Sequence, residues 1–248
     1  MDLKNKVAVV TGGAGGIGEH ICLSMAARGA KIAIIHLAFE VENAGQIVNV
    51  IKAGGGEAVA VEADITKEEE VEAAVAKVIQ KFAAVHILVN CAGITIDGTV
   101  VKLKKESFEK VLAVNLTGAF LAMKAVLPQM ISQQHGRIIN ISSIAGLIGL
   151  RGASAYAASK AGLIALSKSV AREVARKGIT VNVICPGYIN AGLTKGVAKE
   201  YFEDLMATVP MAKVGEPEDI GAGVAFLASG GARYVTGEVL RIDGGMAM

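Results

Sequence analysis

Short apolar runs alternate with longer helical segments along the whole chain. The short runs are rich in Val, Ile and Ala, and we expect buried strands at residues 7–10, 32–35, 58–61, 87–89, 137–141, 180–184 and 238–242. The segments between them have helical periodicity, at residues 16–28, 40–52, 67–82, 104–130, 156–177 and 217–227. Strands that are apolar nearly throughout, each followed by a helix, are typical of a parallel sheet covered on both faces. The pattern therefore predicts an α/β protein, a doubly wound Rossmann-type fold with a seven-stranded parallel sheet.

The ends of several helices are marked in the sequence. Gly29 and Gly178 each follow a cationic residue at the end of a predicted helix, which is a favoured helix ending. Thr66 and Glu69 are spaced as a capping box, which would open the third helix. No linker, low-complexity segment or charge block divides the chain, so residues 1–248 are expected to form one domain. Residues 187–210 are the least regular segment and are expected to form a lid-like region over a ligand.

Composition and charge narrow the class of protein. Hydrophobic residues make up 52% of the chain and charged residues 19%, which indicates a large buried core and not a disordered chain. The net charge of +2 argues against a nucleic-acid-binding protein. No uninterrupted apolar run approaches the roughly 18 residues of a membrane span, and the first apolar run is short for a signal peptide. We therefore expect a cytoplasmic protein without a membrane segment.

The three cysteines, Cys22, Cys91 and Cys185, are far apart and form no Cys-x-x-Cys pair. This spacing indicates neither a zinc site nor a disulfide framework, and we expect reduced, buried thiols. No metal site is expected, because His and Cys residues are not clustered.

The first predicted strand runs directly into a glycine-rich turn, residues 11–18 (Thr-Gly-Gly-Ala-Gly-Gly-Ile-Gly), and a helix follows. Glycines allow a tight turn and a close approach to a pyrophosphate, and the helix N-terminus offers N–H groups and a positive dipole end to an anion. The alternative is a tight turn that binds no ligand. The position between strand and helix, at the start of the chain, favours a dinucleotide site.

A carboxylate is expected at the end of the second strand of such a site, where it would bind the ribose 2′-hydroxyl. His36 stands there instead, followed by Leu37. Neither these residues nor Gly15 supplies the Arg or Lys that would bind a 2′-phosphate. The cofactor is NAD(H) or NADP(H), and the missing cation favours NAD(H). His36 itself is either a cofactor contact or a solvated loop residue.

A second set of polar residues follows the fifth predicted strand. Ser142 and Ser143 end that strand, and Tyr156 and Lys160 lie four residues apart on one face of the next helix. A tyrosine has an ordinary pKa of about 10, and a nearby ammonium favours its phenolate, so Lys160 would lower that pKa. Such tuning suits a general acid or base. A Tyr-x-x-x-Lys pair alone is often a surface contact, but these residues lie at the carboxyl ends of parallel strands, where ligands bind.

Together these motifs resemble those of the short-chain dehydrogenase/reductase family, and the resemblance runs from end to end of the chain. It is carried by the turn at residues 11–18, by Asn-Cys-Ala-Gly at residues 90–93 and by Pro-Gly at residues 186–187. The resemblance implies a catalytic tetrad of Asn115, Ser143, Tyr156 and Lys160. In it Tyr156 donates the proton, Ser143 binds the carbonyl oxygen, Lys160 holds the nicotinamide ribose, and Asn115 anchors a water that links Lys160 to solvent. The implied cofactor-binding residues are Gly12, Gly15, Gly16, Ile17, Gly18, His36, Asp64, Ile65, Asn90, Ala92, Gly93, Tyr156, Lys160, Pro186, Gly187 and Ile189.

Within that family the chain is most similar to the 3-oxoacyl-[acyl-carrier-protein] reductases. The resemblance implies reduction of a 3-oxoacyl thioester, carried on acyl carrier protein or on CoA, and a homotetramer built from residues 104–130, 156–177 and the last strand. Three residues depart from the subgroup: Gly15 lacks the basic side chain of NADPH-using members, Gln134 lacks the basic side chain that docks the carrier, and Ala153 replaces a frequent glutamine. Two alternatives remain open: a dehydrogenase of a free secondary alcohol, such as a sugar, polyol or cyclic alcohol, and a catalytically silent cofactor-binding protein.

Overall fold

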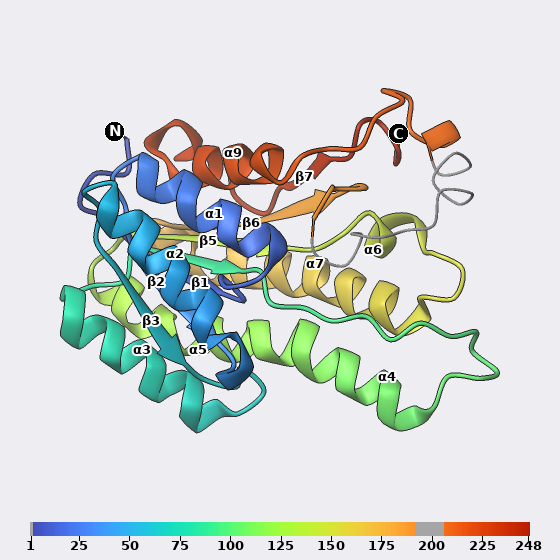
Figure 1. Ribbon diagram of the computed structural model, residues 1–248, viewed down its shortest axis with the longest axis horizontal. Helices are drawn as coiled ribbons and strands as arrows, with labels where there is room; N and C mark the ends of the chain where they lie inside the picture. The colour runs from blue at the N-terminus through green and yellow to red at the C-terminus, as the bar shows by residue number, and fades with distance from the viewer. Residues whose placement is uncertain (1, 192–205) are drawn as a thin grey trace.

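The structure is a computed structural model that describes residues 2–191 and 206–248. A seven-stranded sheet forms its centre, with the strands in the order β3-β2-β1-β4-β5-β6-β7 and every neighbouring pair parallel. The strands are β1 (Val7–Thr11), β2 (Lys31–His36), β3 (Ala58–Glu62), β4 (Ile87–Asn90), β5 (Gly136–Ile141), β6 (Ile179–Pro186) and β7 (Val239–Ile242). The predicted fold class is confirmed (Figure 1).

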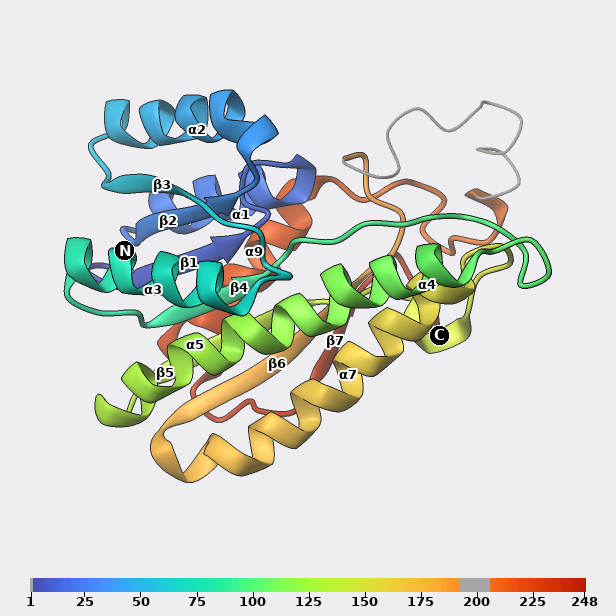
Figure 2. The same ribbon diagram turned by 90° about the horizontal axis from the view of Figure 1, so that it is seen from below.

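Helices cover both faces of the sheet, as Figures 1 and 2 show. One face packs against α1 (Gly16–Ala27), α2 (Val41–Ala53) and α9 (Pro217–Ala228). The other packs against α3 (Glu68–Phe82), α5 (Gly118–Ser132) and α7 (Ser154–Val174). The shorter elements are the helices α4 (Lys105–Leu112) and α6 (Ala145–Ile148), the 3₁₀ turns η1 (Ala38–Glu40), η3 (Ala175–Lys177) and η5 (Gly230–Ala232), and the π-helical turn η2 (Ala113–Thr117).

The chain reverses direction across the sheet between β1 and β4. β1 pairs with β2 on one side and with β4 on the other. The chain runs from β1 through β2 to β3 at one edge, and then returns to β4 and continues toward the other edge. The loops after these strands separate at their carboxyl ends and leave a crevice, which is where ligands of open α/β sheets bind. The fold thereby brings the glycine turn after β1 and the serines after β5 to the same edge of the sheet.

The two predicted helix endings are confirmed, and the predicted capping box at the start of α3 is wrong. Gly29 and Gly178 follow α1 and η3 with positive φ angles of 93° and 71°. The capping box at Thr66 does not form, because the Thr66 hydroxyl donates at 2.7 Å to Asp64 Oδ1 and α3 begins only at Glu68. A carboxylate two residues earlier therefore captures the side chain that would have capped the helix.

The helix predicted at residues 104–130 is continuous but not uniform. It consists of α4, the π-helical turn η2 and α5, which ends at Ser132. By length and composition the segment Lys105–Ser132 could cross a membrane. Of its most apolar stretch, 44% is buried inside the molecule, where Leu121, Val126 and Met130 pack against the sheet. The apolar residues of this buried part belong to the core of the molecule.

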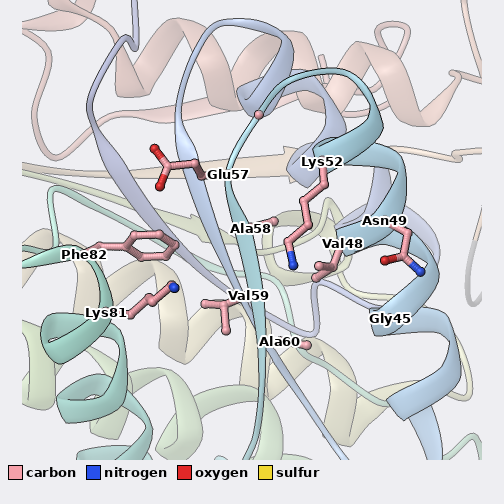
Figure 3. Close-up of a pocket in the computed structure, with 11 residues that line it drawn as sticks. Gly45, Val48, Asn49, Lys52, Glu57, Ala58, Val59, Ala60, Lys81 and Phe82 are labelled. Carbon is pink, nitrogen blue, oxygen red and sulfur yellow. The ribbon is translucent and has the colours of Figure 1, made fainter.

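The β3 edge of the sheet borders a cavity of about 420 Å³ between α2 and α3 (Figure 3). Lys52 of α2 and Lys81 of α3 reach over this edge from opposite sides, and Glu57 pairs with Lys31 at 2.7 Å. Lysines along an edge strand discourage the pairing of that strand with another chain. We therefore interpret the lysines around this cavity as protection of the β3 edge against pairing with another chain.

Candidate active site

A cavity of about 760 Å³ lies at the carboxyl ends of the central strands. Most of the predicted site residues line it: Gly12, Gly15, Gly16, Ile17, Gly18, His36, Asp64, Ile65, Ala92, Gly93, Ser143, Tyr156, Lys160, Pro186, Gly187 and Ile189. The side chains of Asn90 and Asn115 are buried beneath it and do not line it. The structure thus brings residues from separate parts of the chain around one space.

The glycine turn forms one end of the cavity, and its glycines are required by close backbone contacts. A Cβ atom on Gly12, which has a φ of 64°, would lie 2.7 Å from the Cα of Ala92. A Cβ atom on Gly18 would lie 2.1 Å from the carbonyl oxygen of Gly12. The N-terminus of α1 at Gly16 opens directly into this space, where its free N–H groups suit a pyrophosphate. A nicotinamide dinucleotide therefore fits the residues present.

Tyr156, Lys160 and Ser143 stand together at the other end of the cavity. The first turns of α7 present Tyr156 and Lys160, and the Lys160 amine lies 5.6 Å from the centre of the Tyr156 ring. Ser143 follows β5, and its hydroxyl accepts the Ala145 N–H at 3.1 Å. The same hydroxyl lies close enough to Tyr156 to lower the pKa of the phenol. The three side chains form a compact polar group within an apolar wall.

Burial sets the protonation of this group, and it corrects one prediction. Burial raises the pKa of Tyr156, and the neighbouring Ser143 hydroxyl only partly opposes that shift. The prediction that the pKa of Tyr156 lies below its ordinary value is therefore wrong for this structure. Burial also lowers the pKa of Lys160 to about 8. The two shifts have one cause, since removal from water disfavours both the phenolate and the ammonium.

Asn115 sits in the π-helical turn, and both the oxygen and the nitrogen of its side-chain amide make hydrogen bonds. Its Oδ1 accepts the Ile94 N–H at 2.8 Å, and its Nδ2 donates to the Ile94 carbonyl at 2.9 Å and to Ser159 Oγ at 3.0 Å. The amide therefore fixes the loop after β4 to α7 close to Tyr156 and Lys160. Isolated π-helical turns within α-helices are frequent at functional sites.

Asn90 belongs to a buried polar network that sequence analysis missed. Its Nδ2 donates to Asn140 Oδ1 at 2.8 Å, and Asn140 Nδ2 donates to Ser167 Oγ at 2.7 Å. The three side chains are each at most 3% exposed and join β4, β5 and α7. The network holds the strands that end at the cavity against the helix that carries Tyr156. The only sequence signal was a pair of asparagines at the ends of otherwise apolar strands.

Asp64 lines the opposite end of the cavity, just after β3. Burial alone would raise the pKa of Asp64, but two hydrogen bonds from Thr66 and the charge of Lys67 together outweigh it and hold the pKa below its usual value. Asp64 is therefore a carboxylate at neutral pH, able to accept a hydrogen bond from a nucleotide base.

Several cavity residues carried no sequence signal. Glu40, Phe39 and Leu37 lie at the glycine-turn end, whereas Arg151 and Asp97 lie at the Tyr156 end. They come from irregular turns, where no periodicity predicts the direction of a side chain. In the described parts of the chain, no three His, Cys, Asp or Glu residues are arranged to hold a metal ion, and all three cysteines are free thiols.

Known proteins are similar to this chain over almost its whole length. The family model described as "Enoyl-(Acyl carrier protein) reductase" matches residues 12–247. The chain is 42% identical over 248 residues to a Vibrio cholerae protein and 40% identical over 243 residues to a Staphylococcus aureus protein, each named "3-oxoacyl-[acyl-carrier-protein] reductase FabG". These matches cover 100% and 98% of both sequences in each pair. The crystal structure of gox2181 superposes with a TM-score of 0.95 at 35% identity, covering 98% of this chain and 96% of that one.

The fold, the glycine turn and the Ser-Tyr-Lys group together define a nicotinamide-dependent oxidoreductase. The chain belongs to the short-chain dehydrogenase/reductase family, as the sequence motifs indicated.

Proposed function

We propose that this protein reduces a 3-oxoacyl thioester to the 3-hydroxyacyl thioester. The observation that carries the proposal is the position of Tyr156, with Ser143 and Lys160, in the same cavity as the glycine turn. A substrate carbonyl at Tyr156 would thus lie next to a dinucleotide seated on Gly12–Gly18. The full-length similarity to proteins named 3-oxoacyl-[acyl-carrier-protein] reductase supports the choice of substrate.

The residues of the site divide the chemistry between them. The glycine turn, Asp64, Gly93 and Lys160 would hold the dinucleotide, which when bound would supply a hydride to the carbonyl carbon. The Ser143 hydroxyl binds the carbonyl oxygen, and Tyr156 donates its proton to that oxygen as negative charge develops. The raised pKa of Tyr156 keeps the phenol protonated and ready to donate. The Lys160 ammonium then stabilises the phenolate that remains.

Reprotonation of Tyr156 needs a route to solvent. We propose that Asn115 anchors a water that links Lys160 to solvent. A Cβ atom on Gly93 would lie 3.3 Å from Asn115 Oδ1 and 3.4 Å from Lys160 Nζ, so both groups border the same small space. The pKa of Lys160, about 8, supports proton exchange through its amine near neutral pH.

Arg151 favours a thioester over a free alcohol. It is exposed, it lines the Tyr156 end of the cavity, and it makes no ion pair with any described residue. A guanidinium at this position suits a phosphate group, which the carrier arm of an acyl thioester contains and a simple sugar or cyclic alcohol lacks. Gln134 is exposed and uncharged, which leaves CoA as well as acyl carrier protein as the carrier.

We also propose a cytoplasmic homotetramer. The reduced thiols support the location, because disulfides are rare in the cytosol. The assembly would use α4, α5, α7 and β7; on these helices Phe120 is 45% exposed and Ala161 and Ala165 face outward. Figure 2 shows α4 and α5 in line, with α7 alongside them, on one face of the molecule. Light scattering coupled to size-exclusion chromatography would measure the mass, and a monomer would refute the assembly.

The decisive experiment measures the reduction of acetoacetyl-CoA with NADH and with NADPH, beside the oxidation of a panel of free secondary alcohols. The proposal expects the thioester to have a kcat/KM at least about 100-fold above that of any alcohol, which corresponds to about 2.7 kcal/mol. Faster turnover of an alcohol would favour the alcohol-dehydrogenase alternative. Nucleotide binding without turnover of either class would favour the silent cofactor-binding protein.

A further inference from the structure

The end of β2 carries no charged group that could contact the ribose of a dinucleotide. His36 is 4% exposed, and its Nδ1 lies 2.9 Å from the carbonyl oxygen of Leu37, so its ring is turned toward the backbone. Gly15, in the glycine turn, has no side chain. The end of β2 and the glycine turn, where a cofactor-selecting charge is expected, therefore contain none at His36, Leu37 and Gly15.

The turn η1 places the carboxylate of Glu40 between the end of β2 and the glycine turn. Glu40 N donates to the Leu37 carbonyl at 2.9 Å, and Leu37 N donates to Glu40 Oε2 at 3.0 Å. These two bonds close a tight loop and fix one carboxylate oxygen. The other oxygen, Oε1, would lie 3.7 Å from a Cβ atom built on Gly15. Glu40 is half-buried and lines the same cavity as the glycine turn.

The charges around the cavity are unevenly placed. Its glycine-turn end has the carboxylates of Glu40 and Asp64, and no Lys or Arg among the described residues that line it. The cations of the lining, Arg151 and Lys160, lie near Tyr156 at the opposite end. A hydroxyl that donates a hydrogen bond suits the glycine-turn end, whereas a phosphate dianion would meet like charge and no partner.

We propose that Glu40 is the residue that selects the cofactor. Its Oε1 accepts a hydrogen bond from the ribose 2′-hydroxyl of NAD(H), and its charge repels the 2′-phosphate of NADP(H). Glu40 performs the task of the acid expected at the end of β2, from four positions further along the chain. This inference rests on the nicotinamide-dependent function proposed above and adds the choice between its two cofactors.

The test compares the affinities for NADH and NADPH, measured by isothermal titration calorimetry without substrate. The wild type is expected to bind NADH at least about tenfold more tightly than NADPH, a difference of about 1.4 kcal/mol. Glu40→Gln removes the charge and keeps the shape, so NADPH affinity should rise about tenfold while NADH affinity changes less than about threefold. Glu40→Ser, a smaller substitution that also removes the charge, should shift the ratio in the same direction and serves if the first variant folds poorly.

Glu42→Gln is the matched control. Glu42 is exposed in the first turn of α2 and does not line the cavity, so the same change of net charge there should leave the ratio unaltered. A wild type that prefers NADPH, or equal shifts in the Glu40 and Glu42 variants, would overturn the inference. Because binding is measured without substrate, these outcomes are separate from a failure to reduce thioesters, which would overturn the proposed substrate and not the selecting residue.

Discussion

The buried amine of Lys160 donates a hydrogen bond of 2.8 Å to the carbonyl oxygen of Ile141, at the end of β5. This bond fixes the amine beside the Tyr156 ring, but a single carbonyl replaces only part of the water that the ammonium loses. The remaining deficit appears as a pKa of about 8 in place of 10.5. The contacts that hold the Lys160 amine in place therefore also make its protonated form less stable than in water.

The lowered pKa of Lys160 predicts how the free energy of unfolding depends on pH. Between pH 8 and 10 the unfolded chain keeps the Lys160 proton and the folded protein loses it, so stability from this group rises with pH. Relative to Lys160→Met, the free energy of unfolding of the wild type should increase by about 1 kcal/mol per pH unit in that range. Urea denaturation at pH 7, 8, 9 and 10 measures this. Lys168→Met, an exposed substitution on the same helix, should follow the wild-type curve. Parallel curves for wild type and Lys160→Met would contradict the expected pKa.

Tyr156→Phe removes the proposed proton donor and little else. Turnover should fall by at least about 100-fold, the usual scale of a general acid, while the affinity for NADH stays within about threefold of wild type. Steady-state kinetics and calorimetry measure the two quantities. Tyr234→Phe, at a fully exposed tyrosine, provides the control and should retain full activity. Near-normal turnover by Tyr156→Phe would contradict the assignment of Tyr156 as the proton donor.

Gly18→Ala tests the close contact within the glycine turn. The new methyl group would meet the Gly12 carbonyl at 2.1 Å, so the turn must shift. We expect NADH affinity to fall by at least about tenfold and stability to fall by about 1–3 kcal/mol. Gly45→Ala in α2, where a Cβ atom meets nothing within 4 Å, should instead stabilise the protein by about 0.5–1 kcal/mol. Calorimetry and thermal unfolding distinguish the two, and unchanged NADH binding in Gly18→Ala would refute the contact.

The buried network below the cavity predicts a stability effect. Asn140→Ala leaves the Asn90 amide and the Ser167 hydroxyl each without one partner in a dry environment. The free energy of unfolding should fall by about 2–3 kcal/mol. Asn43→Ala, which removes the same amide from an exposed site on α2, should change it by less than about 0.5 kcal/mol. Equal effects of the two substitutions in urea denaturation would show that the network does not stabilise the fold.

The sequence by itself determined the sheet, the layers and the residues around which the site is built. The positions of apolar residues along the chain indicate which residues are buried. Because buried positions repeat with the period of the helix or strand to which they belong, the pattern also predicts the type of element. The glycine turn, and Tyr156 four residues before Lys160 on one helix face, are likewise local features. Spacing along the chain is sufficient to place them, and the structure has them together in one cavity.

Only the tertiary structure determined the hydrogen-bond partners, the pKa shifts and the side-chain positions that depend on how distant segments pack together. Thr66 bonds to Asp64 and does not cap α3, and Asn90 turns into the core toward Asn140. The pKa of Tyr156 rises because burial outweighs the opposing effect of the Ser143 hydroxyl, a balance that no spacing reveals. Glu40 reaches the glycine turn only because η1 folds back upon Leu37. Side-chain direction in turns and the extent of desolvation follow from packing between distant segments, and the one-dimensional pattern does not contain that information.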